Sequence, residues 1–157
     1  MVVSSRKKVI TKKIWLKKLK PKDMDIQFAY TILYVKDVPK TMEFYTNAFG
    51  FGQKFLTPEN DYGEITSGAT TIAFANFELG KANFKKGFTK STLKEKPFGI
   101  ELAFTTSEVE SAMETAIDSG AILLEKTITK PWGQEVGYLR DLNGFIIEIC
   151  SPIATQE

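Results

Sequence analysis

Residues 30–49, YTILYVKDVPKTMEFYTNAF, decide the fold because residues 101–120, ELAFTTSEVESAMETAIDSG, repeat their pattern. In both stretches a strand-like run is followed by a helix-capping signal and then by apolar residues at helical spacing. Met113 occupies in the second stretch the place that Met42 occupies in the first. A repeat of this length is a whole folding module and not a solenoid unit. The sequence therefore predicts two related modules in tandem.

Each half is completed by three more strand-like segments. In the first half Asp37 is predicted to cap the helix, with Pro39 in its first turn and Gly50 at its end. In the second half Ser107 and Glu110 are predicted to form a capping box. The predicted strands are residues 27–35, 51–56, 64–67 and 70–75, then 100–105, 122–128, 135–140 and 145–150.

The predicted fold class is therefore α+β, with two tandem βαβββ modules. We expect their eight strands to form a curved mixed sheet around a cleft, with the helices outside. The predicted segments are a basic extension at residues 1–23, a first module at 24–76, a connector at 77–98, a second module at 99–153 and a tail at 154–157. Part of the connector is expected to dock as a short helix or an arm.

The basic extension differs from the rest of the chain. It holds nine of the 21 basic residues, which leaves 12 basic and 18 acidic residues elsewhere. Three interpretations remain open: a membrane- or nucleic-acid-binding arm, a packed extra helix, or a poorly ordered tail preceding a true start at Met24. The acidic remainder gives no electrostatic reason to bind nucleic acid, so no nucleic-acid partner is expected.

Composition excludes several kinds of chemistry. The chain has no histidine, which rules out Ser-His-Asp and Cys-His catalysis and removes the commonest zinc ligand. Its single cysteine, Cys150, cannot form an internal disulfide and is expected to be a buried apolar residue. These features, with the lack of a long apolar run, predict a cytoplasmic protein that does not span a membrane.

Three segments carry a resemblance to a known family. They are residues 30–38 (YTILYVKDV), the pair Phe44-Tyr45, and the closing run at residues 131–148, with its Trp-Gly and Arg-Asp-Leu-Asn-Gly motifs. Together they resemble the vicinal oxygen chelate superfamily, which includes glyoxalases, bleomycin-resistance proteins and dioxygenases. The resemblance covers roughly residues 25–152, with Leu142 in place of the usual proline. It implies the two-module fold and a homodimer.

The resemblance also implies where a metal would bind. Metal enzymes of the superfamily place one ligand on each of four strands, and these positions fall on Tyr30, Ala73, Glu101 and Glu148. Ala73 has no donor atom, and the phenol of Tyr30 would have to lose a proton at a pKa of about 10. We therefore expect no catalytic metal. If one binds, Glu101, Glu148 and Tyr30 would favour weakly held Mg²⁺ or Mn²⁺.

The cleft residues follow from strand alternation and from the resemblance. The predicted ligand-binding residues are Tyr30, Ile32, Tyr34, Ala73, Glu101, Trp132, Tyr138, Arg140 and Glu148. Glu101 and Glu148 have two interpretations. They are solvated or paired with Arg140, or they bind a basic or hydroxylated ligand and are candidates for general acid–base catalysis.

Three functions remain open at this point. The first is a binding protein similar to the bleomycin-resistance branch, which would sequester a small aromatic or basic ligand without a metal. The second is a divalent-metal-dependent lyase, isomerase or dioxygenase with an oxygen-only site. The third is a structural or regulatory module that makes contact through its basic extension. The sequence does not decide whether the protein is an enzyme, because this fold hosts many activities.

Overall fold

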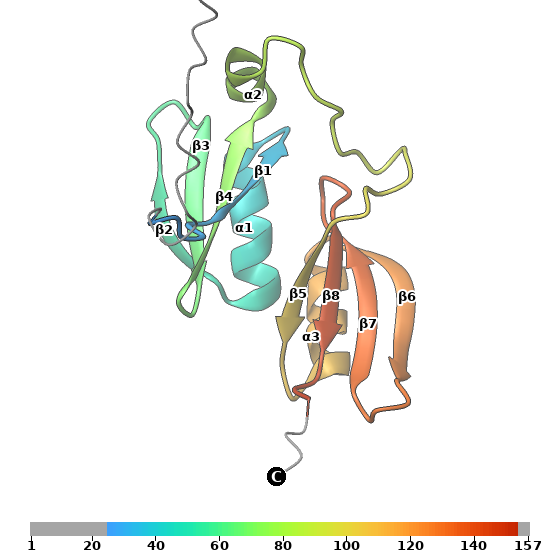
Figure 1. The fold of residues 1–157 in the computed structure, drawn as a ribbon. Coiled ribbons are helices and arrows are strands. Elements are labelled where there is room, and N and C mark those ends of the chain that lie inside the picture. Colours follow the sequence, from blue (N-terminus) through green and yellow to red (C-terminus); the bar gives the residue numbers. More distant parts are fainter. Residues whose placement is uncertain (1–24, 154–157) are drawn as a thin grey trace, which may run out of the picture.

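The computed structural model describes residues 25–153, which form two βαβββ modules joined by a connector (Figure 1). The predicted α+β, two-module fold is confirmed. The first module contains β1 (Thr31–Val35), α1 (Val38–Phe49), β2 (Gly52–Leu56), β3 (Tyr62–Ser67) and β4 (Thr70–Asn76). The second contains β5 (Glu101–Thr105), α3 (Val109–Asp118), β6 (Ile122–Thr129), β7 (Glu135–Arg140) and β8 (Ile146–Cys150). The connector begins with the short helix α2 (Phe77–Asn83).

The interpretations of the basic extension and of the C-terminal tail lie outside the described residues. Within residues 25–153, none of the helices has the length and apolar character needed to cross a membrane.

The two modules have the same topology. The strand order is β1-β4-β3-β2 in one sheet and β5-β8-β7-β6 in the other. In each sheet the first and last strands of the module run parallel, and the remaining pairs are antiparallel. The eight strands thus form two four-stranded sheets, each with its own helix.

Helix α1 has the caps that its sequence predicts. The Asp37 carboxylate accepts a hydrogen bond from the Lys40 backbone N–H at 2.9 Å, and Pro39 lies in the first turn. Gly50 ends the helix with φ 68, a left-handed conformation that glycine adopts without steric cost. The predicted boundaries of α1 are therefore confirmed.

The predicted capping box of α3 is wrong. The N-cap position is Glu108, and its side chain makes no capping hydrogen bond. Its backbone N–H donates instead to the Thr106 hydroxyl at 3.1 Å. The helix begins one residue later than a capping box of Ser107 and Glu110 requires. Ser107 is therefore not the N-cap residue.

Two strand starts also differ from the prediction. β1 begins at Thr31, the first residue with a partner on β4, and not at residue 27. β3 begins at Tyr62, which pairs with Ala75, although the predicted strand begins at residue 64. This earlier start places two additional residues in the sheet.

Each helix packs closely on a glycine of its own sheet. A Cβ atom added to Gly63 on β3 would collide with the Met42 side chain, and one added to Gly137 on β7 would lie 2.8 Å from Met113. Met42 and Met113 are the pair that the sequence repeat aligns. The repeat therefore extends to the packing of helix on sheet.

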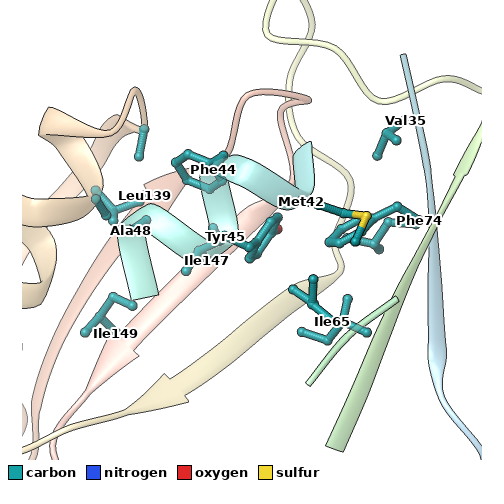
Figure 2. Packing of buried hydrophobic residues seen from close by; sticks show 14 of the residues in the cluster. Val35, Met42, Phe44, Tyr45, Ala48, Ile65, Phe74, Leu139, Ile147 and Ile149 are labelled. Carbon is teal, nitrogen blue, oxygen red and sulfur yellow. The ribbon is translucent and has the colours of Figure 1, made fainter. Parts of the chain in front are cut away.

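The helices lie between the two sheets and not outside them (Figure 2). The Tyr45 ring on α1 is 5.2 Å from the Phe74 ring on β4 and 6.4 Å from the Phe104 ring on β5, measured between centroids. One hydrophobic core therefore spans both modules. Because the inner side of each sheet faces this core, the other side of each sheet faces away from it.

Helix α1 lies between the two sheets because it has two buried rows of side chains. The apolar residues at helical spacing in α1 include Val38, Met42 and Tyr45, whereas Thr41, Phe44 and Ala48 form a second row and are buried as well. The second row needs a cover, which the second module supplies.

Hydrogen bonds join the modules at the β7–β8 turn. The Asn143 amide donates to the Thr41 hydroxyl at 3.0 Å, and the Tyr45 hydroxyl donates to the Asp141 carboxylate at 3.1 Å. Burial raises the pKa of the Asp141 carboxyl above its ordinary range.

Candidate ligand-binding site

The side of the first sheet that faces away from α1 is called here the first face. Ile32 lies beside Ala73, which lies beside Glu64, and in the next row Tyr34, Ala75 and Tyr62 are neighbours. Directly paired residues project to the same side of a sheet. Pairing thus places Ile32, Tyr34, Phe55, Tyr62, Glu64, Ala73 and Ala75 on the first face. Lys54 joins them through its ion pair with Glu64, and Tyr30 through its contact with Tyr62.

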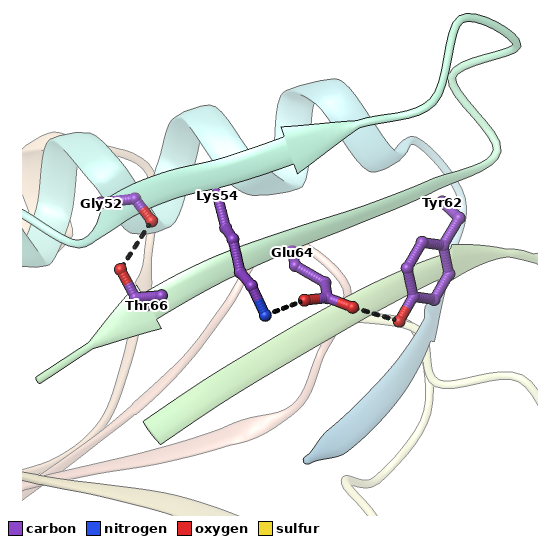
Figure 3. A network of polar contacts seen from close by, with 5 residues as sticks. All are labelled: Gly52, Lys54, Tyr62, Glu64 and Thr66. Atoms are coloured by element: carbon purple, nitrogen blue, oxygen red, sulfur yellow. Dashed lines mark hydrogen bonds and ion pairs between the residues drawn. The ribbon is translucent and has the colours of Figure 1, made fainter. Parts of the chain in front are cut away.

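A network of polar side chains occupies the middle of the first face (Figure 3). The Lys54 ammonium lies 2.7 Å from one oxygen of the Glu64 carboxylate. The Tyr62 hydroxyl donates to the other oxygen at 2.9 Å. Glu64 is only 7% exposed, whereas the Lys54 side chain is 50% exposed. Both carboxylate oxygens are therefore occupied, and the ammonium is held at the surface by a buried anion.

The protonation states in this network follow from these contacts. The hydrogen bond from Lys54 lowers the pKa of the Glu64 carboxyl and outweighs the effect of its burial. Burial and the hydrogen bond to Glu64 raise the pKa of the Tyr62 phenol far above its ordinary value, and Tyr30 adds to the effect. At neutral pH the network thus contains a carboxylate, an ammonium and a protonated phenol.

The connector covers the part of the first face around Tyr34. The Tyr34 ring is 4.9 Å from the Phe88 ring and 5.7 Å from the Phe84 ring, between centroids. Beside them, a cavity of about 230 Å³ is lined by Ile32 and Tyr34 together with aromatic and apolar residues of the connector and second module, including Phe88, Phe98, Ile100 and Phe145. The end of the face near Tyr30, which is 44% exposed, stays open.

The side of the second sheet that faces away from α3 is called here the second face. Glu148 on β8 pairs with Tyr138 on β7, and Glu101 lies on the neighbouring strand β5. Hydrogen bonding to Glu148 raises the pKa of Tyr138 to about 12, with burial and the charge of Glu101 adding to the shift. Glu125 on β6 also pairs with Tyr138, so three carboxylates and one phenol share this face. The Lys130 ammonium lies 5.7 Å from the Tyr138 ring centroid.

Other predicted site residues have different environments. The Arg140 guanidinium donates to the backbone carbonyl of Thr92 at 2.8 Å and to that of Gly144 at 3.1 Å, so it anchors the connector. It is buried, and within residues 25–153 it forms no ion pair with a carboxylate. Trp132 lies in the β6–β7 loop, is 62% exposed and donates to the Gln134 side chain at 3.0 Å.

Seven of the nine predicted ligand-binding residues thus fall into two groups, and Trp132 and Arg140 belong to neither. Tyr30, Ile32, Tyr34 and Ala73 belong to the first face. Glu101, Tyr138 and Glu148 belong to the second face. Because the common core lies between the sheets, the two groups do not meet within one chain.

The residues that would hold a superfamily metal do not assemble in this chain. Ala73 offers no donor atom, and Tyr30 lies on the first face while Glu101 and Glu148 lie on the second. Within the described part of the chain, no three His, Cys, Asp or Glu side chains lie close enough together to hold an ion. The donor set of a single chain therefore does not fit a four-ligand metal.

The sequence did not reveal Lys54, Tyr62 or Glu64 as site residues. Glu64 lies directly beside Ala73, so the first face does carry a carboxylate, on β3 instead of β4. An earlier predicted start of β3, with its pairing to β4, would have revealed it.

Comparison with known proteins gives one family. The family model of the glyoxalase-like domain matches residues 28–154. A search of curated proteins found no match.

Solved structures share the fold. A glyoxalase-related enzyme from Fulvimarina pelagi is 23% identical, with a TM-score of 0.69 over 80% of this chain and 88% of that chain. A glyoxalase/bleomycin resistance protein/dioxygenase family enzyme from Burkholderia phytofirmans PsJN is 18% identical, with a TM-score of 0.67 over 78% and 96%. A glyoxalase/bleomycin resistance protein/dioxygenase from Nocardioides is 17% identical, with a TM-score of 0.64 over 85% and 88%. At these identities the likeness concerns the fold alone.

Proposed function

The chain belongs to the glyoxalase-like domain family, and from that premise we propose that it binds a small aromatic or basic ligand without a catalytic metal. The ligand lies between the first face of one copy and the second face of another. The observation that carries the proposal is the separation of the two faces within a chain. A ligand can touch both only if a second copy brings its second face opposite the first.

The exposed apolar side chains support such an assembly. Ile32 and Phe55 lie on the first face and Ile122 and Ile128 on the second, and all four are more than a third exposed. Apolar surface gathered on a sheet face is a common mark of an interaction site. A homodimer would cover this surface and enclose the ligand.

The charge of the second face supports a basic ligand. Glu101 and Glu148 lie there, and Arg140 forms no ion pair with either of them because its guanidinium donates to backbone carbonyls. The Lys130 ammonium, 5.7 Å from the Tyr138 ring centroid, is the other cation near this face. A protonated amine can pair with these carboxylates, while an aromatic ring packs on the apolar side chains of the opposite wall. Sequestration of such a compound, as in a resistance protein, is the role that we propose. The single, buried Cys150 fits a reducing compartment such as the cytoplasm.

Calorimetric titration tests the proposal with phenethylamine, a primary alkylamine that carries a phenyl ring, as the probe. We expect the EDTA-treated protein to bind it, and Glu148→Gln to weaken binding about tenfold, which corresponds to roughly 1.4 kcal/mol. Glu114→Gln, an exposed change on α3, is the matched control and should leave the affinity unchanged.

Addition of Mn²⁺ separates this proposal from its alternative. Binding that appears only with Mn²⁺ would replace it with an oxygen-only metal site built from Glu101, Glu148 and Tyr30, as in a lyase, isomerase or dioxygenase. If phenethylamine fails to bind with or without the ion, the proposal is wrong.

A further inference from the structure

We infer that the first face contains a subsite for an anionic group, built on Lys54, so that the ligand carries a carboxylate as well as an amine. This inference rests on the proposed function, because the amine is assigned to the second face of the other copy. The ligand class is thus a zwitterion with an aromatic or apolar side chain, such as an amino acid.

The first argument is the way in which Lys54 is held. A free surface lysine loses much side-chain entropy when it binds a ligand. Here the ammonium is already fixed 2.7 Å from Glu64, which is buried and is itself held by Tyr62. Much of the ordering cost is therefore met before the ligand arrives.

The second argument is the hydrogen-bonding capacity that remains. Both oxygens of Glu64 are occupied, so the network offers no free carboxylate oxygen to a ligand. The ammonium has three donors, and Glu64 takes one of them. The Lys54 side chain is half exposed, and the 44% exposed Tyr30 lies next to Tyr62, so these are the polar residues of the first face that solvent reaches. Hydrogen-bond donors with a positive charge suit a carboxylate.

The third argument is the contrast between the two faces. The first face presents donors beside apolar Ile32 and Phe55, and the second presents the carboxylates of Glu101 and Glu148. Once two copies face each other, one wall selects an anionic group and the other a cationic group. A ligand with only one of these groups would leave one wall without its partner.

The experiment compares three probes by calorimetry with the full-length, EDTA-treated protein: L-phenylalanine, phenethylamine and 3-phenylpropanoate. We expect phenylalanine to bind about tenfold more tightly than phenethylamine. Lys54→Met should abolish that difference and weaken 3-phenylpropanoate, while phenethylamine affinity changes less than twofold. Lys40→Met, an exposed change on α1, is the matched control and should alter none of the three affinities.

A second variant guards against misfolding. Lys54→Met leaves Glu64 buried and unpaired, so the double variant Lys54→Met/Glu64→Gln removes both charges and should show the same loss for the two carboxylate probes. Equal affinities of the intact protein for phenylalanine and phenethylamine overturn the inference, as does equal weakening of both by either variant. The proposed function survives either result, and it fails instead if phenethylamine does not bind.

Discussion

Glu64 shows how a single residue changes the view of the site. The position expected to carry a first-module ligand is Ala73, yet the neighbouring β3 residue in the same row is a carboxylate. Its charge is already used by Lys54, so it organises donors and is not free to bind a cation. Placement on the other strand thus gives the first face a carboxylate that is already paired with the more exposed Lys54, in place of a free one.

The pH dependence of stability tests this role of Glu64. Its folded-state pKa lies below the ordinary 4.5, so its ion pair contributes stability above that pH and loses it as the pH falls through the lowered value. Because Lys54 is half exposed, Glu64→Gln should cost only about 0.5–1 kcal/mol at pH 7. At pH 3 the cost should be smaller, because more of the Glu64 carboxyl is then protonated.

Urea denaturation at both pH values measures this difference. Glu78→Gln, which breaks the exposed pair with Lys81, is the control and should have no measurable effect. A cost for Glu64→Gln that is larger at pH 3 than at pH 7 would contradict the assigned ion pair.

The sequence predicts well which side chains of one strand share a face. It predicts poorly which side chains of the adjacent strand lie beside them. Alternation correctly groups Ile32 with Tyr34, because a strand needs only its own residues for that. Glu64 and Tyr62 could not be found in this way, since their place beside Ala73 and Ala75 depends on the register between two strands. Arg140 falls on a face by alternation, but its bond to Thr92 depends on the path of the connector.

The β7–β8 turn holds the connector against the second module. Gly144 has φ 90, and a Cβ atom there would lie 2.6 Å from the Thr92 carbonyl oxygen and 2.6 Å from the Arg140 guanidinium. The turn thus brings the connector against the second module where Arg140 binds both segments.

Gly144→Ala should release the connector at this point. We expect a loss of about 2–4 kcal/mol of unfolding free energy, from the strained φ and from the collision with backbone. Gly133→Ala is a matched control, because Gly133 has φ 87 but nothing within 4 Å of an added Cβ. It should show only the strain, about 1–2 kcal/mol. Denaturation curves measure the unfolding free energy of both variants. Equal losses would show that the contact of the turn with Thr92 does not contribute to stability.

For the molecule as a whole, the number and order of elements follow from the sequence, but the side on which the helices lie does not. Val38 and Met42 on α1 account for its packing on its own sheet, whereas Tyr45 also contacts Phe104 and Asp141 of the second module. The second row, with Thr41, Phe44 and Ala48, contains a polar residue and a small one, so it does not stand out as apolar. Its burial by the second module turns both candidate faces outward.

The central claim is that one ligand site needs two copies of the chain, and a mixed dimer tests it most directly. Ile32→Arg blocks the first face and Glu101→Arg blocks the second, both at exposed positions. Each variant alone should bind no phenethylamine. A dimer of one copy of each, purified through two different tags, has one wholly intact site, so calorimetry should find one bound probe per dimer. No binding by the mixed dimer, or no dimer at all, would contradict the account.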